Sequence, residues 1–205
     1  PAFAQDPAKV DAGHYKVEAE NEFVRVVRMK RGPHENVPMH EHPAAVVVFL
    51  TDVHEKSIAP DGKAVEVNRK SGDVIFNEAT RHSEDDLSDK PSEVVLIEWK
   101  APAHSAPLSD DLVTVDPKHA KVELENDRLR IIRVRRGAHE ASAMHSHPVD
   151  VVVFMTDIHQ TVTGKDGVPH EVNRKRGEVS VNKPSTHEET NLKDGPMESI
   201  LVELK

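Results

Sequence analysis

Histidine is the residue type whose number and spacing stand out in this chain, with fourteen copies in 205 residues. The segment 39–43 reads Met-His-Glu-His-Pro and recurs at 144–148 as Met-His-Ser-His-Pro. In an extended strand, side chains two residues apart share a face, with Cβ atoms roughly 6–7 Å apart. Two neutral imidazoles placed in this way can both bind one metal ion at roughly 2.0–2.2 Å.

A third histidine follows each pair after the same interval, His82 in the first case and His187 in the second. Nitrogen donors of this kind suit Fe(II), Mn, Ni, Co or Zn, and the sequence does not choose among these divalent metals. Three neutral imidazoles leave the ion its full charge and an open position, so a small anionic ligand is expected. The predicted metal ligands are His40, His42, His82, His145, His147 and His187.

Two glutamates are the candidate catalytic residues. Glu84 and Glu189 each lie two residues after the third histidine, and thus on its face of the strand. They could be a fourth ligand, an anchor for a histidine, or a general base. The alternative is a solvated charge at the rim of the barrel, and the sequence leaves both interpretations open.

Four further histidines keep an even spacing to the pairs, namely His34, His54, His139 and His159. Pro33 and Pro38 make a turn at His34 the better interpretation. For all four residues, turn or surface hydrogen bonds are favoured over metal binding.

An internal duplication organises the chain. Residues 10–100 align with residues 115–205 without a gap and are identical at 44 of 91 positions. All six histidines of the first copy recur in the second copy. We therefore expect two domains, 10–100 and 115–205, joined by a Pro- and Ala-rich linker over 101–114 that takes no part in a core.

The elements that would position these residues are strands. Residues 23–29, 45–50 and 94–99 are β-branched or apolar runs, and Asp61-Gly62 indicates a hairpin turn. No stretch has a sustained helical period, which favours an all-β sandwich or barrel in each copy. Residues at an even spacing from the histidine pairs would share their face and line the barrel interior. These residues are Val46, Val48, Leu50, Val151, Val153 and Met155.

On these motifs the chain resembles the cupin superfamily over nearly its whole length, twice. The His-x-His pair, the following proline, the Asp-Gly turn and the later Gly…His segment match the two motifs of that family. The resemblance implies a bicupin, with two tandem double-stranded β-helix (jelly-roll) barrels and a metal site in the mouth of each.

The chain departs from the family pattern at several motif positions. Val46 and Val151 stand where the family has a glutamate ligand, and His34 and His139 stand where it has a glycine. The asparagine of the second motif is Asp86 in the first copy. The resemblance therefore implies a site of three histidines without the usual glutamate.

The leading functional hypothesis is a metal-dependent enzyme that acts on a small anionic metabolite. The enzyme would be an oxygenase, or a related lyase or isomerase. The alternative is a bicupin that binds or senses a small ligand without turning it over, and the sequence does not decide between enzyme and binder. A net charge of −9 without a basic cluster argues against nucleic acid. No apolar run approaches the length of a membrane helix.

Two expectations concern assembly and location. The two copies should pack on each other as an intramolecular pseudo-dimer, and further oligomerisation stays open. Ala2-x-Ala4 fits the remnant of a signal-peptidase site, which favours a periplasmic or extracellular protein, with a cytoplasmic one as the alternative.

Overall fold

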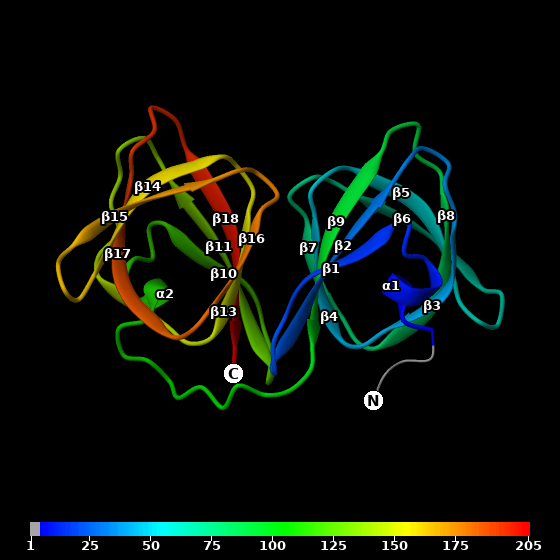
Figure 1. Ribbon diagram of the computed structural model, residues 1–205, viewed down its shortest axis with the longest axis horizontal. Helices are drawn as coiled ribbons and strands as arrows, with labels where there is room; N and C mark the ends of the chain where they lie inside the picture. Colours follow the sequence, from blue (N-terminus) through cyan, green and yellow to red (C-terminus); the bar gives the residue numbers. More distant parts are fainter. Residues whose placement is uncertain (1–4) are drawn as a thin grey trace. The chain divides into compact units, whose positions relative to one another are not determined.

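The computed structural model describes residues 5–205, which form two compact units. The first unit ends at Ala101 and the second spans Pro102–Lys205. Each unit, taken by itself, consists of one five-stranded and one four-stranded antiparallel sheet (Figure 1). The segment Ala2–Ala4, which carries the proposed cleavage motif, lies outside the described residues.

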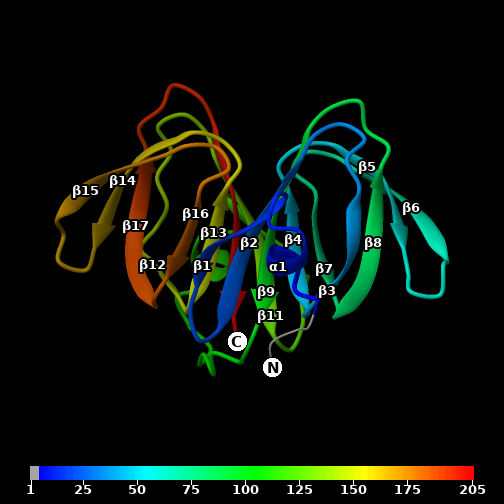
Figure 2. The ribbon, with the colours of Figure 1, turned by 45° about the vertical axis from the view of Figure 1, so that its right-hand side comes forward.

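In the first unit the strand orders are β1-β2-β9-β4-β7 and β3-β8-β5-β6. From β2 onward the chain passes repeatedly between the two sheets, so strands far apart in sequence become neighbours. Figure 2 shows β8 and β6 on the opposite side of this unit from β4 and β9. The strands are β1 Tyr15–Glu20, β2 Val24–Arg31, β3 Val37–His42, β4 Ala45–Phe49, β5 Val53–Ile58, β6 Ala64–Arg69, β7 Val74–Asn77, β8 Thr80–Asp86 and β9 Ser92–Trp99.

The second unit repeats this topology with the orders β10-β11-β18-β13-β16 and β12-β17-β14-β15. The predicted fold class, an all-β chain with two tandem barrels of this type, is confirmed. The strands are β10 Ala120–Glu125, β11 Leu129–Arg136, β12 His145–His147, β13 Asp150–Phe154, β14 Ile158–Gly164, β15 Pro169–Arg174, β16 Val179–Asn182, β17 Ser185–Asn191 and β18 Met197–Leu204.

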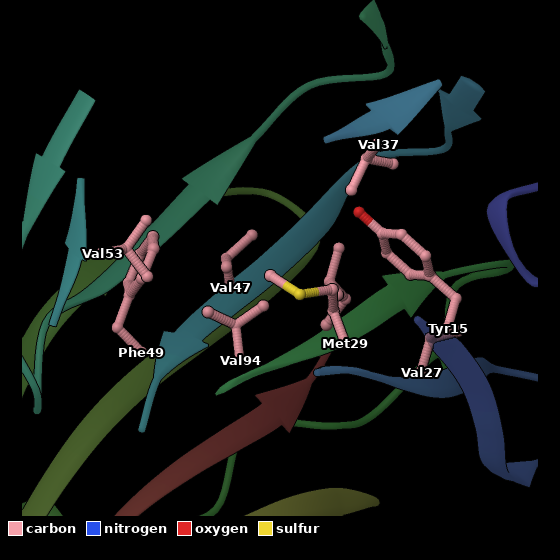
Figure 3. Packing of buried hydrophobic residues seen from close by; sticks show 9 residues of the cluster. Tyr15, Val27, Met29, Val37, Val47, Phe49, Val53 and Val94 are labelled. Atoms are coloured by element: carbon pink, nitrogen blue, oxygen red, sulfur yellow. The ribbon is translucent and has the colours of Figure 1, made fainter. Parts of the chain in front are cut away.

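A buried apolar cluster fills the first barrel between its sheets. Phe49 and Val53 lie at one end of the cluster and Tyr15 at the other, with Met29 and Val94 between them (Figure 3). Burial of each such side chain contributes roughly 1.5–3 kcal/mol relative to exposure. The strands fold together because these residues alternate with others that face away from the interior.

The prediction of which residues line the barrel interior is wrong, because the alternate residues of the strand face inward. Val47 and Phe49, rather than Val46 and Val48, face the interior of the first barrel. In the second barrel the corresponding residues are Val152 and Phe154. The cause is a break after the histidine pair, because β3 and β4 belong to different sheets and the period of two does not continue across Pro43.

Two four-residue helices precede the barrels, α1 Pro7–Val10 and α2 Leu112–Val115. The carboxylates of Asp6 and Asp111 cap them by accepting from the backbone N–H two residues on. Leu112 is buried in the core of the second unit, so the end of the stretch expected to stay outside any core belongs to one. Neither helix has the length to cross a bilayer, nor does any other helix among residues 5–205.

Candidate metal centres

The three histidines of the first copy meet on one face of the four-stranded sheet. His40 and His42 point to the same side of β3, and His82 on β8 is the direct cross-strand partner of His40. The ring centroids of these three residues lie 4.6–5.6 Å apart, and the rings of His40 and His42 are buried. The third histidine is therefore supplied by the strand next to β3, rather than by one across the barrel.

The second copy builds the same cluster. His145 and His147 lie on β12, and His187 on β17 pairs directly with His145. Their ring centroids lie 4.7–5.2 Å apart. In each cluster one nitrogen per ring can be chosen so that all three lie within 4.8 Å of one another.

Hydrogen bonds hold the outer nitrogen of each ring in the first cluster. His40 Nδ1 donates to the carbonyl of Pro38 at 2.8 Å, and His42 Nδ1 contacts Glu98 Oε1 at 3.1 Å. His82 Nδ1 lies 2.9 Å from Ser57 Oγ. With these partners on Nδ1, the Nε2 atoms are left free to face the centre of the cluster.

The inner nitrogens fit a shared cation. His40 Nε2 and His42 Nε2 lie 2.9 Å apart, and with both protons on Nδ1 these two atoms face each other with lone pairs. His82 Nε2 and, in the second cluster, His145 Nε2 are buried without a hydrogen-bond partner. Three nitrogens converging in this way suit a divalent ion bound at roughly 2.0–2.2 Å.

Burial keeps the metal-free rings of His40, His82 and His187 neutral. It lowers the pKa of His40 to about 4 and the pKa of His82 to about 3, with help from the neighbouring rings. It likewise lowers the pKa of His187 to about 4. Burial also acts on His147, but Glu203 and Asp150 outweigh it and raise the pKa of that ring.

This burial predicts a pH-dependent stability of the metal-free protein. Below about pH 6.5 the unfolded chain takes up protons at His40 and His82, whereas the folded chain does so only near pH 4 and 3. The free energy of unfolding should therefore fall as the pH drops from 6.5 toward 4, by up to about 1.4 kcal/mol per pH unit for each ring. Urea unfolding in EDTA at several pH values measures this slope. His40→Gln with His82→Gln should flatten it, and an unchanged slope would contradict the assignment.

A buried glutamate behind each cluster was not predicted. Glu98 on β9 contacts His42, and Glu203 on β18 contacts His147 Nδ1 at 2.9 Å. Each carboxylate also accepts from an arginine, Arg25 or Arg130, at 2.7 and 2.9 Å. A carboxylate on the outer nitrogen fixes the tautomer of a ligand histidine and raises its basicity. The available signal was a glutamate retained in both copies directly after an apolar run, 94–97 in the first copy and 200–202 in the second.

Glu84 and Glu189, the candidate catalytic residues, face the clusters but are held by arginines. Arg31 Nη1 donates to Glu84 Oε2 at 3.0 Å, and Arg136 Nη1 lies 2.6 Å from Glu189 Oε2. The other oxygen lies 3.6 Å from His82 Nε2 in the first unit and 3.8 Å from His187 Nε2 in the second.

The surroundings of these two glutamates differ between the copies. Burial raises the pKa of Glu84, which shares Arg31 with Glu55 and Asp86. Burial acts on Glu189 as well, but Arg136 and the cluster histidines outweigh it and lower the pKa to about 2.

The remaining paired histidines stay outside the clusters. His34 and His139 have φ of 58° and 59°, and each pairs with an aspartate on an exposed surface. This left-handed backbone explains why glycine would also suit the position. His54 and His159 are exposed and pair with Glu66 and Glu171. The interpretation of all four as turn or surface residues is confirmed.

A cavity opens beside each cluster. In the first unit it measures about 440 Å³ and is lined by His42, His82 and Glu84 among others. In the second unit it measures about 530 Å³ and is lined by His147, His187 and Glu189 among others. Cavities of this size hold small metabolites.

Asp150 is a further residue of the second cavity. The break between β12 and β13 turns its side chain toward the cavity. Asn182 donates to it at 2.7 Å, and burial raises its pKa to about 6. Its counterpart in the first copy is Ala45, so this carboxylate is specific to the second site.

Comparison with solved structures identifies similar folds at low sequence identity. Oxalate decarboxylase from Bacillus subtilis, in a structure concerned with its Mn(II) centres, matches with a TM-score of 0.62 and 13% identity, covering 92% of this chain and 71% of that chain. A cupin 2 conserved barrel domain protein from Leptotrichia buccalis matches with a TM-score of 0.58 and 14% identity, covering 93% and 88%. No protein-family model and no curated protein sequence matches the chain.

Proposed function

Because the chain has the cupin fold twice, in a bicupin arrangement, we propose that it is a metal-binding bicupin that holds one divalent ion in each three-histidine cluster. The observation that carries the proposal is the convergence of three inner imidazole nitrogens, two of them 2.9 Å apart in the first cluster, in a buried site. His40, His42 and His82 would hold the ion in the first barrel, and the three matching histidines would hold it in the second.

The reaction class we propose is that of an oxygenase, or a related lyase or isomerase, on a small anionic metabolite. A divalent ion bound by three neutral imidazoles would act as a Lewis acid with its full charge. The chain's own part is to exclude water with the apolar residues of the barrel wall and to orient the rings through Glu98 and Glu203. The Mn(II) centres of the similar decarboxylase make manganese the first ion to test, and iron, nickel, cobalt and zinc suit the same donors.

One observation favours the second candidate function, a bicupin that binds or senses its ligand without turning it over. Both cavity carboxylates, Glu84 and Glu189, share an oxygen with a buried arginine. A general base must be free to take a proton from the substrate, and these carboxylates are constrained by their ion pairs with arginine.

Elemental analysis tests the proposal for both candidates. Untagged protein purified without added metal should contain about two divalent ions per chain, because each unit has one complete cluster. Protein that contains no metal, and takes up none when it is dialysed against Mn(II), Fe(II) or Zn(II), would refute it.

Replacing Glu84 and Glu189 with glutamine should weaken metal binding about tenfold, or about 1.4 kcal/mol. The expected effect is modest because the carboxylate oxygen lies 3.6 or 3.8 Å from the third histidine and its partner oxygen stays on the arginine. Competition with a metal-chelating dye measures the affinity. Unchanged affinity would show that neither carboxylate has a role in holding the ion.

A further inference from the structure

The two barrels differ in the partners of one buried arginine that both copies retain. Arg31 and Arg136 occupy equivalent positions at the ends of β2 and β11, and their side chains are 0% and 3% exposed. Burial of a guanidinium is costly unless its donors are paired, so the partners of the two residues can be compared directly.

In the first barrel every edge of the guanidinium is filled. Arg31 Nη1 donates to Glu84, and Nε donates to Ser92 Oγ at 3.0 Å. Nη2 donates to Glu55 and lies 3.4 Å from Asp86 Oδ1. Three carboxylates and a hydroxyl therefore surround one positive charge.

In the second barrel the same guanidinium keeps one partner. Arg136 Nη1 pairs with Glu189, whereas Nε and Nη2 are buried without an acceptor. The three lost acceptors have been replaced by residues that leave these donors unpaired. Glu55 is replaced by Gln160, Asp86 by Asn191 and Ser92 by Met197.

The side chains at the replaced positions do not pair with Arg136, and two of them form hydrogen bonds with other groups. Gln160 donates its amide to Glu189 Oε1 at 2.9 Å, and Asn191 donates to the carbonyls of Gly137 and Gly195. Met197 offers only a thioether. Nε and Nη2 are neighbours on one edge of the guanidinium plane, and this edge is the fork that binds a carboxylate through two parallel hydrogen bonds.

Arg136 belongs to the wall of the second cavity, and its unpaired Nε and Nη2 atoms are buried there. Arg136, Gln160 and Met197 all line that cavity together with His147 and His187. In the first barrel its partners Glu55 and Glu84 line the cavity, whereas Arg31 itself does not.

The two cavity walls also differ in their balance of positive and negative residues. The first wall carries Arg69 against the three carboxylates Glu55, Glu78 and Glu84. The second wall carries three cations and three carboxylates, because Lys183 replaces Glu78 and Arg136 is added. Those second-wall residues are Arg136, Arg174, Lys183, Asp150, Glu189 and Glu198.

We propose that the second barrel binds a small carboxylate on the Nε–Nη2 edge of Arg136, beside its histidine cluster, and that the first barrel does not accept one. The two sites have therefore diverged. The second barrel has a ligand site at Arg136, whereas in the first barrel the charge of Arg31 is neutralised by carboxylates of the chain itself. This inference deepens the proposed function and rests on it for the ion beside the carboxylate, but the arginine fork itself requires no metal.

A charge-swap variant tests the inference, with oxalate as the probe. Gln160→Glu places in the second barrel the carboxylate that occupies Nη2 of the arginine in the first, so the change is one that this fold already accommodates. Val168→Glu is the matched control, because it adds the same charge at a hairpin position that is 50% exposed. Titration calorimetry on the full-length, metal-free protein, and again after metal loading, gives stoichiometry and affinity.

The metal-free wild-type protein should bind one oxalate per chain, Gln160→Glu should weaken binding at least tenfold, and Val168→Glu should leave it unchanged. Two equivalent sites per chain, no binding at all, or equal binding by wild type and Gln160→Glu would overturn the inference. If oxalate binds only the metal-loaded protein and Gln160→Glu has no effect, the ion alone holds it, and the inference fails while the proposed metal function stands. One Gln160-sensitive site in a protein that takes up no metal would leave the inference standing and refute the proposed function.

Discussion

Replacing both His42 and His147 with alanine should abolish metal binding in both barrels. Each substitution removes one of three converging nitrogens, and the two remaining imidazoles rarely hold an ion tightly. We expect the affinity of each site to fall on the order of a thousandfold, about 4 kcal/mol at 1.4 kcal/mol per factor of ten. Metal content after dialysis and competition with a chelating dye measure the loss.

The matched control for this variant is His54→Ala with His159→Ala. These two histidines are retained in both copies but are exposed, and they pair with Glu66 and Glu171 on β6 and β15. The control removes the same number of imidazoles and should keep about two ions per chain. Full metal content in His42→Ala/His147→Ala, or an equal loss in the control, would show that the ligands are misassigned.

Substituting glutamine for Glu98 and Glu203 should cause the second-largest loss of metal affinity, although neither residue faces the ion. Each carboxylate contacts Nδ1 of a cluster histidine, His42 at 3.1 Å and His147 at 2.9 Å. The amide keeps the shape but removes the charge that holds the tautomer and raises the basicity of the ring. Loss of such a partner costs about 10–100-fold in metal affinity.

The same change should also lower stability, because Arg25 and Arg130 lose a buried acceptor charge. A charged hydrogen bond of this kind contributes about 1.5–3 kcal/mol, so urea unfolding should separate the effect on folding from the effect on affinity. Glu18→Gln with Glu123→Gln is the control, since these glutamates pair with Arg28 and Arg133 and contact no cluster histidine. Equal metal affinity in the two double variants would refute a role for Glu98 and Glu203 in holding the ligands.

The duplicated sequence was sufficient to predict the three-histidine sets and the all-β architecture. A His-x-His pair is locally informative, because the period of two in a strand places both rings on one face wherever the strand lies. The third histidine could be added because each copy repeats it at the same distance. The turn at Asp61-Gly62 could be predicted for a similar local reason, since Gly62 adopts a φ of 82° that glycine tolerates.

The face of the sheet on which a side chain lies could be predicted only within one continuous strand. The inward-facing residues of β4 and β13 were misassigned because the chain changes sheets between the histidine pair and the next strand. A one-residue change in alignment turns every side chain to the other face. The position of Asp150 in the second cavity follows from the same break.

The partners of the site residues were decided by the tertiary structure alone. Glu98 reaches His42 across 56 positions of sequence, and Arg31 gathers acceptors from β5, β8 and β9. Such contacts depend on which strands become neighbours, and local residue preferences do not specify that. The sequence at these two positions does not reveal that Arg31 is fully paired and Arg136 is not, because both copies have arginine there. The difference arises from three substitutions on other strands, and a buried charge takes its properties from whatever the fold places around it.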